Sequence, residues 1–168
     1  MERWSIHLQK ETFKFSAAHF LIFPDGTAER LHGHNYRVFV TIEAALDEFG
    51  LVLDFKSVKP VIRAIVDELD EHWLLPGEHP VLKTETRADG VVEIRYLERY
   101  YAAPADDVIV MPMNNVSAEN LSTWLGRELR GRLIKSFPHL RIQHMTVAVE
   151  ETSGQRGEYH YQDEPQQT

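Results

Sequence analysis

The sequence predicts an α+β fold, in which an antiparallel sheet of four strands is covered on one face by two helices. Long alternating runs at about residues 4–20 and 31–45 are typical of half-buried strands. Two segments with a nearly helical apolar period follow, at about 54–70 and 117–137. A third alternating run at 142–149 and a short fourth at 158–161 complete the order. Strands at both ends of the chain with helices between them favour helices packed on one face of the sheet.

The second strand contains the most informative motif, a His-Gly-His run. Alternate side chains of a strand point to one face, so His32 and His34 project together. On the first strand, His19 ends an alternating apolar series. If the two strands pair, the three imidazoles converge, and three histidines with one open position suit a catalytic zinc ion. The alternative is that all three are ordinary strand histidines.

Both helices begin with a capping signal. Asp54 can cap the first helix and Ser117 the second, whereas Pro60 either kinks the first helix or postpones its start. Between the helices, residues 77–113 form an insertion with strands predicted at 91–97 and 108–111. Because this segment is too short for its own core, we expect an added hairpin. The prediction is a single domain over residues 1–162 with a disordered polar tail at 163–168.

Composition disfavours several functional classes. The chain has 168 residues and a formal net charge of −8, which argues against general nucleic-acid binding because phosphate neutralisation needs basic patches. It has no cysteine, which rules out disulfides and thiolate ligands. No apolar run is long enough for a signal peptide core or a membrane span. We therefore expect a cytoplasmic protein with no membrane or nucleic-acid partner.

A set of short motifs resembles the 6-pyruvoyl-tetrahydropterin synthase family, which includes the 6-carboxytetrahydropterin synthases. The motifs are Phe15-Ser-Ala-Ala-His19, Leu31-His-Gly-His-Asn-Tyr36, Val52-Leu-Asp-Phe55, Leu69-Asp70 and Glu151-Thr152. The resemblance covers about residues 12–152. It implies the tunnelling fold (T-fold), whose subunits join sheet to sheet into a barrel, commonly as a homo-trimer or homo-hexamer. It also implies zinc as cofactor at His19, His32 and His34, and 7,8-dihydroneopterin triphosphate as substrate.

The resemblance also gives a role to Glu29. The better-known branches use a cysteine in the loop before the His-Gly-His run, and this chain has none. Glu29, three residues before His32, resembles the branch in which glutamate replaces that cysteine. Those relatives cleave the side chain in a retro-aldol reaction that gives 6-hydroxymethyl-7,8-dihydropterin. Glu29 is then the catalytic base, and the alternative is a solvated loop glutamate.

Four further residues lie at or next to family positions. The family has an Asp-His proton-transfer pair after the first helix, but here Glu71 separates Asp70 from His72, so either a relay or ordinary helix-end residues are possible. Glu151 matches the carboxylate that grips the amidine edge of the pterin, and the alternative is a surface position at a strand end. Ser117 matches a serine or threonine near the pterin, although a role as a helix cap alone explains it.

The expected function is therefore a zinc-dependent lyase of pterin synthesis. Within the family, the alternatives are formation of 6-carboxytetrahydropterin or 6-pyruvoyltetrahydropterin, against which the absent cysteine counts. Outside it, the alternatives are an oligomer that binds a pterin or purine without catalysis, and a structural oligomer in which zinc serves only as a strut.

Overall fold

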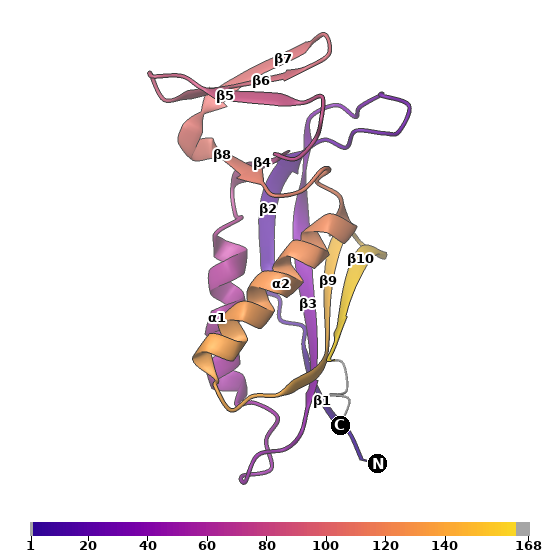
Figure 1. The fold of residues 1–168 in the computed structure, drawn as a ribbon, viewed down its shortest axis with the longest axis vertical. Helices are drawn as coiled ribbons and strands as arrows, with labels where there is room; N and C mark the ends of the chain where they lie inside the picture. The colour runs from indigo at the N-terminus through magenta and orange to yellow at the C-terminus, as the bar shows by residue number, and fades with distance from the viewer. Residues whose placement is uncertain (1, 164–168) are drawn as a thin grey trace.

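The computed structural model describes residues 2–163 and confirms the α+β class (Figure 1). Of the predicted disordered tail at 163–168, residues 164–168 lie outside the described residues. The main sheet runs in the order β10-β9-β3-β2-β4-β8, and β1 also pairs with β3. Its strands are β1 (Trp4–Leu8), β2 (Lys14–His19), β3 (His32–Ala44), β4 (His72–Pro76), β8 (Val108–Met111), β9 (Ile142–Thr152) and β10 (Gln155–Gln162).

The predicted antiparallel sheet of four strands is the run β10-β9-β3-β2. Two features differ from the prediction. The first predicted strand is divided into β1 and β2, and the sheet is extended beyond β2 by β4 and β8, which pair in parallel. The long central strand β3 follows the predicted alternation, because its residues at 36, 38, 40 and 42 are all buried.

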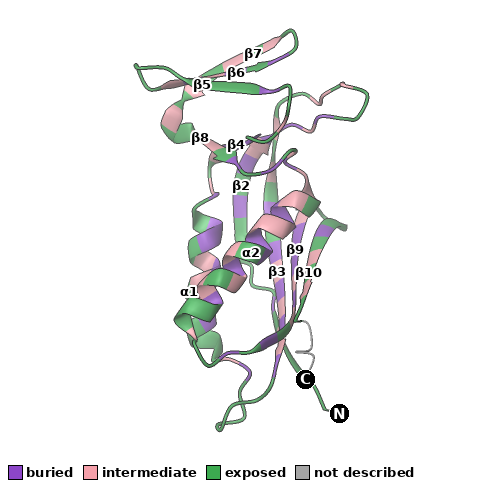
Figure 2. Cartoon of the chain, viewed as in Figure 1, coloured by how far each residue is buried: buried purple, intermediate pink, exposed green. Residues whose placement is uncertain are grey.

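Helices α1 (Phe55–Asp67) and α2 (Ala118–Ser136) lie on the same face of the sheet (Figure 1). Asp54 caps α1 by accepting from the Lys56 N–H, and Ser117 caps α2 by accepting from the Asn120 N–H, as predicted. Pro60 lies within α1. Figure 2 shows buried segments of β2, β3 and β9 behind the two helices, where the main core lies.

The predicted pairing of 91–97 with 108–111 is wrong. The insertion instead forms a separate antiparallel sheet of β5 (Lys83–Thr86), β6 (Val91–Tyr96) and β7 (Arg99–Pro104), at one end of the molecule (Figure 1). The reason is a two-residue turn at Leu97-Glu98, which reverses the chain directly onto β6. A 3₁₀ turn (Ala105–Asp107) then leads into β8, which joins the main sheet beside β4.

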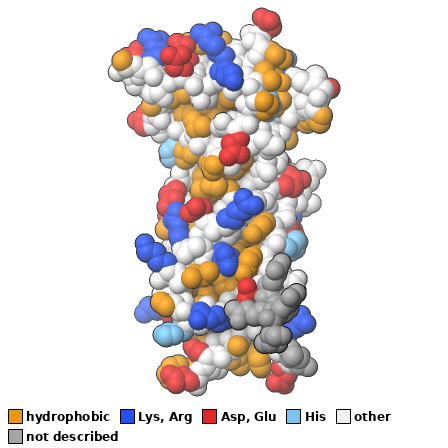
Figure 3. All heavy atoms as spheres, in the orientation of Figure 1, with side chains coloured by type: hydrophobic (Ala, Val, Ile, Leu, Met, Phe, Trp, Pro, Cys, Tyr) orange, Lys and Arg blue, Asp and Glu red, His pale blue; other side chains and the backbone are white. Residues whose placement is uncertain are grey.

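The insertion is attached to the main sheet through a second apolar cluster. The main domain contributes Phe20, Trp73 and Leu75 to this cluster, and the insertion contributes Ile94 and Tyr96. At this end of the molecule, Figure 3 shows basic and acidic side chains close together, in keeping with the ion pairs that β6 makes on its outer face. The insertion therefore packs against the main sheet.

Candidate metal and active site

Strand pairing brings the three predicted histidines together. His19 lies opposite His32 in the β2–β3 ladder, and Ala17 lies opposite His34, so all three imidazoles project from one face. The ring centroid of His19 lies 4.8 Å from that of His32 and 5.2 Å from that of His34. Within residues 2–163, the ligand atoms of these histidines and of Glu151 lie within 4.8 Å of one another and could hold a metal ion.

Backbone carbonyl groups fix two of the rings with the ligand nitrogen facing the cluster. His19 Nδ1 lies 2.8 Å from the Val116 carbonyl oxygen, and His32 Nδ1 lies 2.8 Å from that of Arg30. A carbonyl oxygen can only accept, so each Nδ1 donates to it, and Nε2 is the nitrogen left to bind a metal. This arrangement, with one ring nitrogen donating to the backbone, is typical of histidines that bind a metal through the other nitrogen.

The surroundings of His19 favour a cation at this point. Burial is the main cause that lowers the pKa of His19, which favours its neutral ring. Its Nε2 is buried and makes no hydrogen bond among the described residues, although Glu151 Oε1 lies only 2.9 Å away. A carboxylate and an unprotonated ring nitrogen are both acceptors, and they repel at this distance unless a cation accompanies them. The donor set therefore fits a metal ion.

Glu151, rather than Glu150, faces the histidines. Glu150 lies opposite Arg37 in the β3–β9 ladder, on the other face from His34 and Tyr36. Glu151 Oε1 also lies 3.1 Å from His34 Nε2. The resemblance assigns Glu151 to the pterin, whereas the structure shows its carboxylate within reach of the same metal position.

Tyr36 is a neighbour of the site that the sequence analysis did not single out. Its ring is fully buried, with its centroid 5.6 Å from that of His34 and 5.8 Å from that of His19. Burial raises the pKa of the Tyr36 hydroxyl, and the negative charges of Glu151 and Glu29 raise it further, so the phenol stays protonated. The signal was present in the alternation, because Tyr36 follows His34 on the same face of β3.

The structure also places Glu29 beside the cluster. Glu29 Oε2 lies 3.9 Å from His32 Nε2 and accepts a hydrogen bond from the Leu21 N–H at 3.0 Å. The Glu29 N–H in turn donates to the Leu21 carbonyl. The side chain is one-third exposed, which leaves it accessible to a bound molecule. Glu29 is thus not a freely solvated loop residue.

Asp70 and His72 do not form a side-chain pair within the chain. Asp70 Oδ1 accepts from the Ser16 N–H at 2.7 Å, and His72 Nδ1 donates to the main-chain carbonyl of Asp70 at 2.6 Å. The intervening Glu71 has a left-handed backbone with φ of 60°, which accommodates the additional residue between them. His72 begins β4, so it is not a helix-end residue.

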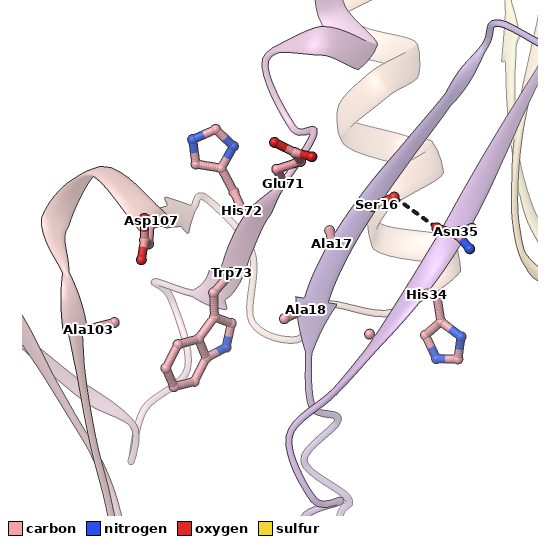
Figure 4. Close-up of a pocket in the computed structure, with 11 residues that line it drawn as sticks. Ser16, Ala17, Ala18, His34, Asn35, Glu71, His72, Trp73, Ala103 and Asp107 are labelled. Carbon is pink, nitrogen blue, oxygen red and sulfur yellow. Dashed lines mark hydrogen bonds between the residues drawn. The ribbon is translucent and has the colours of Figure 1, made fainter.

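His72 instead lines a pocket of about 560 Å³ together with Glu71, Trp73 and Ser16, and His34 of the histidine cluster borders the same pocket. In Figure 4 the rings of His72 and His34 point in opposite directions, with β2 between them. Ser117, the remaining predicted residue, is observed as the cap of α2.

The comparisons with known proteins agree with this geometry. The family described as 6-pyruvoyl tetrahydropterin synthase matches residues 7–162. The chain belongs to the 6-pyruvoyl tetrahydropterin synthase family. As a member it is a lyase of pterin biosynthesis and has the T-fold.

Individual relatives of this synthase family cover most of the chain. A Methanocaldococcus jannaschii protein, named as a candidate 6-carboxy-5,6,7,8-tetrahydropterin synthase, is 35% identical over 144 residues, which is 84% of this chain and 86% of that protein. The solved 6-pyruvoyl tetrahydropterin synthase of Plasmodium falciparum superposes with a TM-score of 0.87 at 27% identity, covering 96% of this chain and 99% of its own.

A Plasmodium vivax 6-pyruvoyltetrahydropterin synthase also superposes with a TM-score of 0.87. It is 26% identical and covers 97% of this chain and 100% of its own. The solved form is a variant in which a glutamate, described as a catalytic residue, is replaced by alanine. Within the described residues of the present chain, no helix is both long and apolar enough to span a membrane.

Proposed function

We propose that this synthase-family member is a zinc-dependent lyase that acts on the side chain of 7,8-dihydroneopterin triphosphate and releases 6-hydroxymethyl-7,8-dihydropterin. The observation that carries the proposal is the carboxylate of Glu29 beside the histidine cluster, in a chain without cysteine. The catalytic glutamate of the P. vivax relative supports this choice of base.

His19, His32 and His34 would hold the zinc ion. With Nδ1 of His19 and His32 donating to backbone carbonyls, Nε2 is the ring nitrogen left to bind zinc, which prefers imidazole ligands of this kind. When bound, zinc would act as a Lewis acid that lowers the pKa of a side-chain hydroxyl of the substrate.

Glu29 would then serve as the general base. Its carboxylate would take the proton from the hydroxyl on the second carbon of the substrate side chain. The bond between the first and second carbons breaks, the second carbon becomes an aldehyde, and the electron pair passes into the pterin ring system. Reprotonation of the first carbon gives the hydroxymethyl product. The Leu21 N–H holds Glu29 Oε2 and leaves the other carboxylate oxygen for this proton.

Glu151 would anchor the pterin, because a carboxylate can accept two parallel hydrogen bonds from the planar amidine edge. Its position on the histidine face supports an inward role. A role for Asp70 and His72 in proton transfer stays a prediction. His72 and His34 border the same pocket, but their rings point in opposite directions (Figure 4), so any proton transfer by His72 would pass through a molecule bound in that pocket.

A second candidate is 6-carboxytetrahydropterin synthase activity, which the name of the M. jannaschii relative favours. The two reactions differ in product. Incubation of the zinc-loaded protein with the triphosphate, followed by chromatography and mass spectrometry of the pterins, should yield the 6-hydroxymethyl compound. Release of the 6-carboxy or 6-pyruvoyl compound would support the other branches, and intact substrate after prolonged incubation would support a binding module without catalysis.

A further inference from the structure

The inserted sheet touches the loop that carries Glu29. This loop connects β2 to β3 and lies beside the β5–β7 sheet at the same end of the molecule (Figure 1). The contact is made by the tip of the β6–β7 hairpin, where Tyr96 and Arg99 are register partners on either side of the two-residue turn. Leu97, in that turn, has a φ of 50°, so the reversal is tight although it lacks glycine.

Both residues that flank the turn donate to main-chain carbonyls of the loop. The Tyr96 hydroxyl donates to the Gly26 carbonyl at 2.7 Å. The Arg99 guanidinium donates to two consecutive carbonyls, those of Ala28 and Glu29. A planar guanidinium with several fixed donors can bridge two acceptors in this way, whereas a lysine ammonium has no such fork.

The hairpin that makes these contacts is itself firmly held. Tyr96 and Ile94 are buried in the apolar cluster that also contains Phe20 and Trp73 of the main domain. The loop between β2 and β3 is also held near its start, at Ile22. The Asn115 side chain accepts a hydrogen bond from the Ile22 N–H and donates one to the Ile22 carbonyl. The Glu29 segment thus lies between two fixed supports.

We propose that Arg99 is a positioning residue, through which the insertion holds the main chain of Glu29 so that its carboxylate stays beside His32. The inference rests on the proposed role of Glu29 as the base. It assigns a purpose to residues 77–113: this segment supports the base from outside the sheet. Among the described residues, the hydrogen bonds of the Arg99 side chain go to the main-chain carbonyls of Ala28 and Glu29, so we infer that its effect reaches the reaction through Glu29.

The test compares Arg99→Ala and Arg99→Lys with Arg95→Ala. Arg95 is a matched control, since it lies on the same hairpin but pairs with Glu93 and stacks on Tyr100, away from the loop. Three quantities are measured: kcat and KM with the triphosphate, bound zinc, and amide hydrogen exchange of the segment 20–31, which includes the Leu21 N–H that binds Glu29.

Arg99→Ala should lower kcat roughly tenfold to a hundredfold, because small displacements of a catalytic group have effects of this size. KM and bound zinc should change less than about twofold, since the histidines and Glu151 are untouched. Exchange in segment 20–31 should accelerate, Arg99→Lys should recover part of kcat, and Arg95→Ala should match the wild type. In a Glu29→Ala background, Arg99→Ala should cause no further loss.

The inference is overturned if Arg99→Ala exchanges like the wild type in segment 20–31, or if it lowers kcat equally in the presence and absence of Glu29. Should Arg99→Ala fail to fold, Arg99→Lys provides the same comparisons with the charge retained. If the wild-type protein shows no turnover, the proposed function fails, while the exchange comparison still decides whether Arg99 holds the Glu29 loop.

Discussion

The two nitrogens of His19 have separate partners. Nδ1 donates to Val116, 97 residues away in sequence, and Nε2 faces the cluster of ligand atoms. Strand alternation predicted that His19, His32 and His34 meet on condition that the two strands pair, which they do. It could not predict the Val116 contact, because that contact depends on how the segment before α2 packs against the end of β2. The same holds for Arg99, which reaches Glu29 from a distant hairpin.

Replacement of Glu29 by alanine should lower kcat by roughly 10²- to 10⁴-fold, which is the usual contribution of a general base. Bound zinc should be unchanged, because Glu29 Oε2 lies 3.9 Å from His32 and Glu29 is outside the four-residue cluster. Steady-state kinetics and metal analysis of the same preparations provide the check. Full activity in Glu29→Ala would remove this residue from the mechanism.

The role of Glu151 is tested by Glu151→Gln, with Glu150→Gln as the control on the opposite face. As a pterin anchor, Glu151 accepts charge-assisted hydrogen bonds worth about 1.5–3 kcal/mol. Its replacement should therefore raise KM by roughly tenfold or more with zinc retained. Loss of zinc with an unchanged KM would instead identify Glu151 as a metal ligand.

At the scale of elements, helix limits and faces were predictable because their signals are local. Asp54 and Ser117 act as caps, and the alternation of β3 gives its buried face. Strand partners were less predictable. The run 108–111 has the composition of a strand, but nothing in its own residues distinguishes β6 from β4 as its partner. Pairing is decided by the Leu97-Glu98 turn and by packing on Phe20 and Trp73.

The contact between α2 and β10 gives a stability prediction. A Cβ added at Gly157 would lie 2.5 Å from the Glu119 nitrogen and 2.6 Å from the Ala118 carbonyl carbon, both main-chain atoms that cannot move independently. Gly157→Ala should lower the free energy of unfolding by about 1–3 kcal/mol, the usual effect of overpacking. Denaturant unfolding measures this change.

Gly131 provides the control. It lies in α2, the helix that Gly157 contacts, and an added Cβ there meets nothing within 4 Å. Gly131→Ala should stabilise the protein by up to about 1 kcal/mol through helix propensity. Equal effects of the two substitutions would contradict close packing of β10 against the first turn of α2.

At the scale of the whole molecule, the sequence predicted the four antiparallel strands and the two covering helices. The extension of the sheet by β4 and β8 was missed, since parallel pairing joins segments that are far apart in the chain. The second apolar cluster was missed for a related reason. It forms only when the insertion packs on residues of the main sheet, so no single segment contains its pattern.

The ends of the main sheet predict assembly. Within residues 2–163, β10 and β8 terminate the strand order, and an unpaired edge is a template for a strand from another chain. We expect a homo-trimer or homo-hexamer, with a mass of three or six chains by light scattering coupled to size-exclusion chromatography. A monomer mass across micromolar concentrations would contradict this prediction.

The three-histidine centre is tested by counting zinc ions and their ligands in the reconstituted protein. Metal analysis and X-ray absorption at the zinc edge should give one zinc per chain, with three imidazole nitrogens at about 2.0–2.1 Å. Both signals should disappear in His19→Ala. A wild-type protein that binds no zinc, or that binds it with fewer than three imidazoles, would contradict the centre formed by His19, His32 and His34.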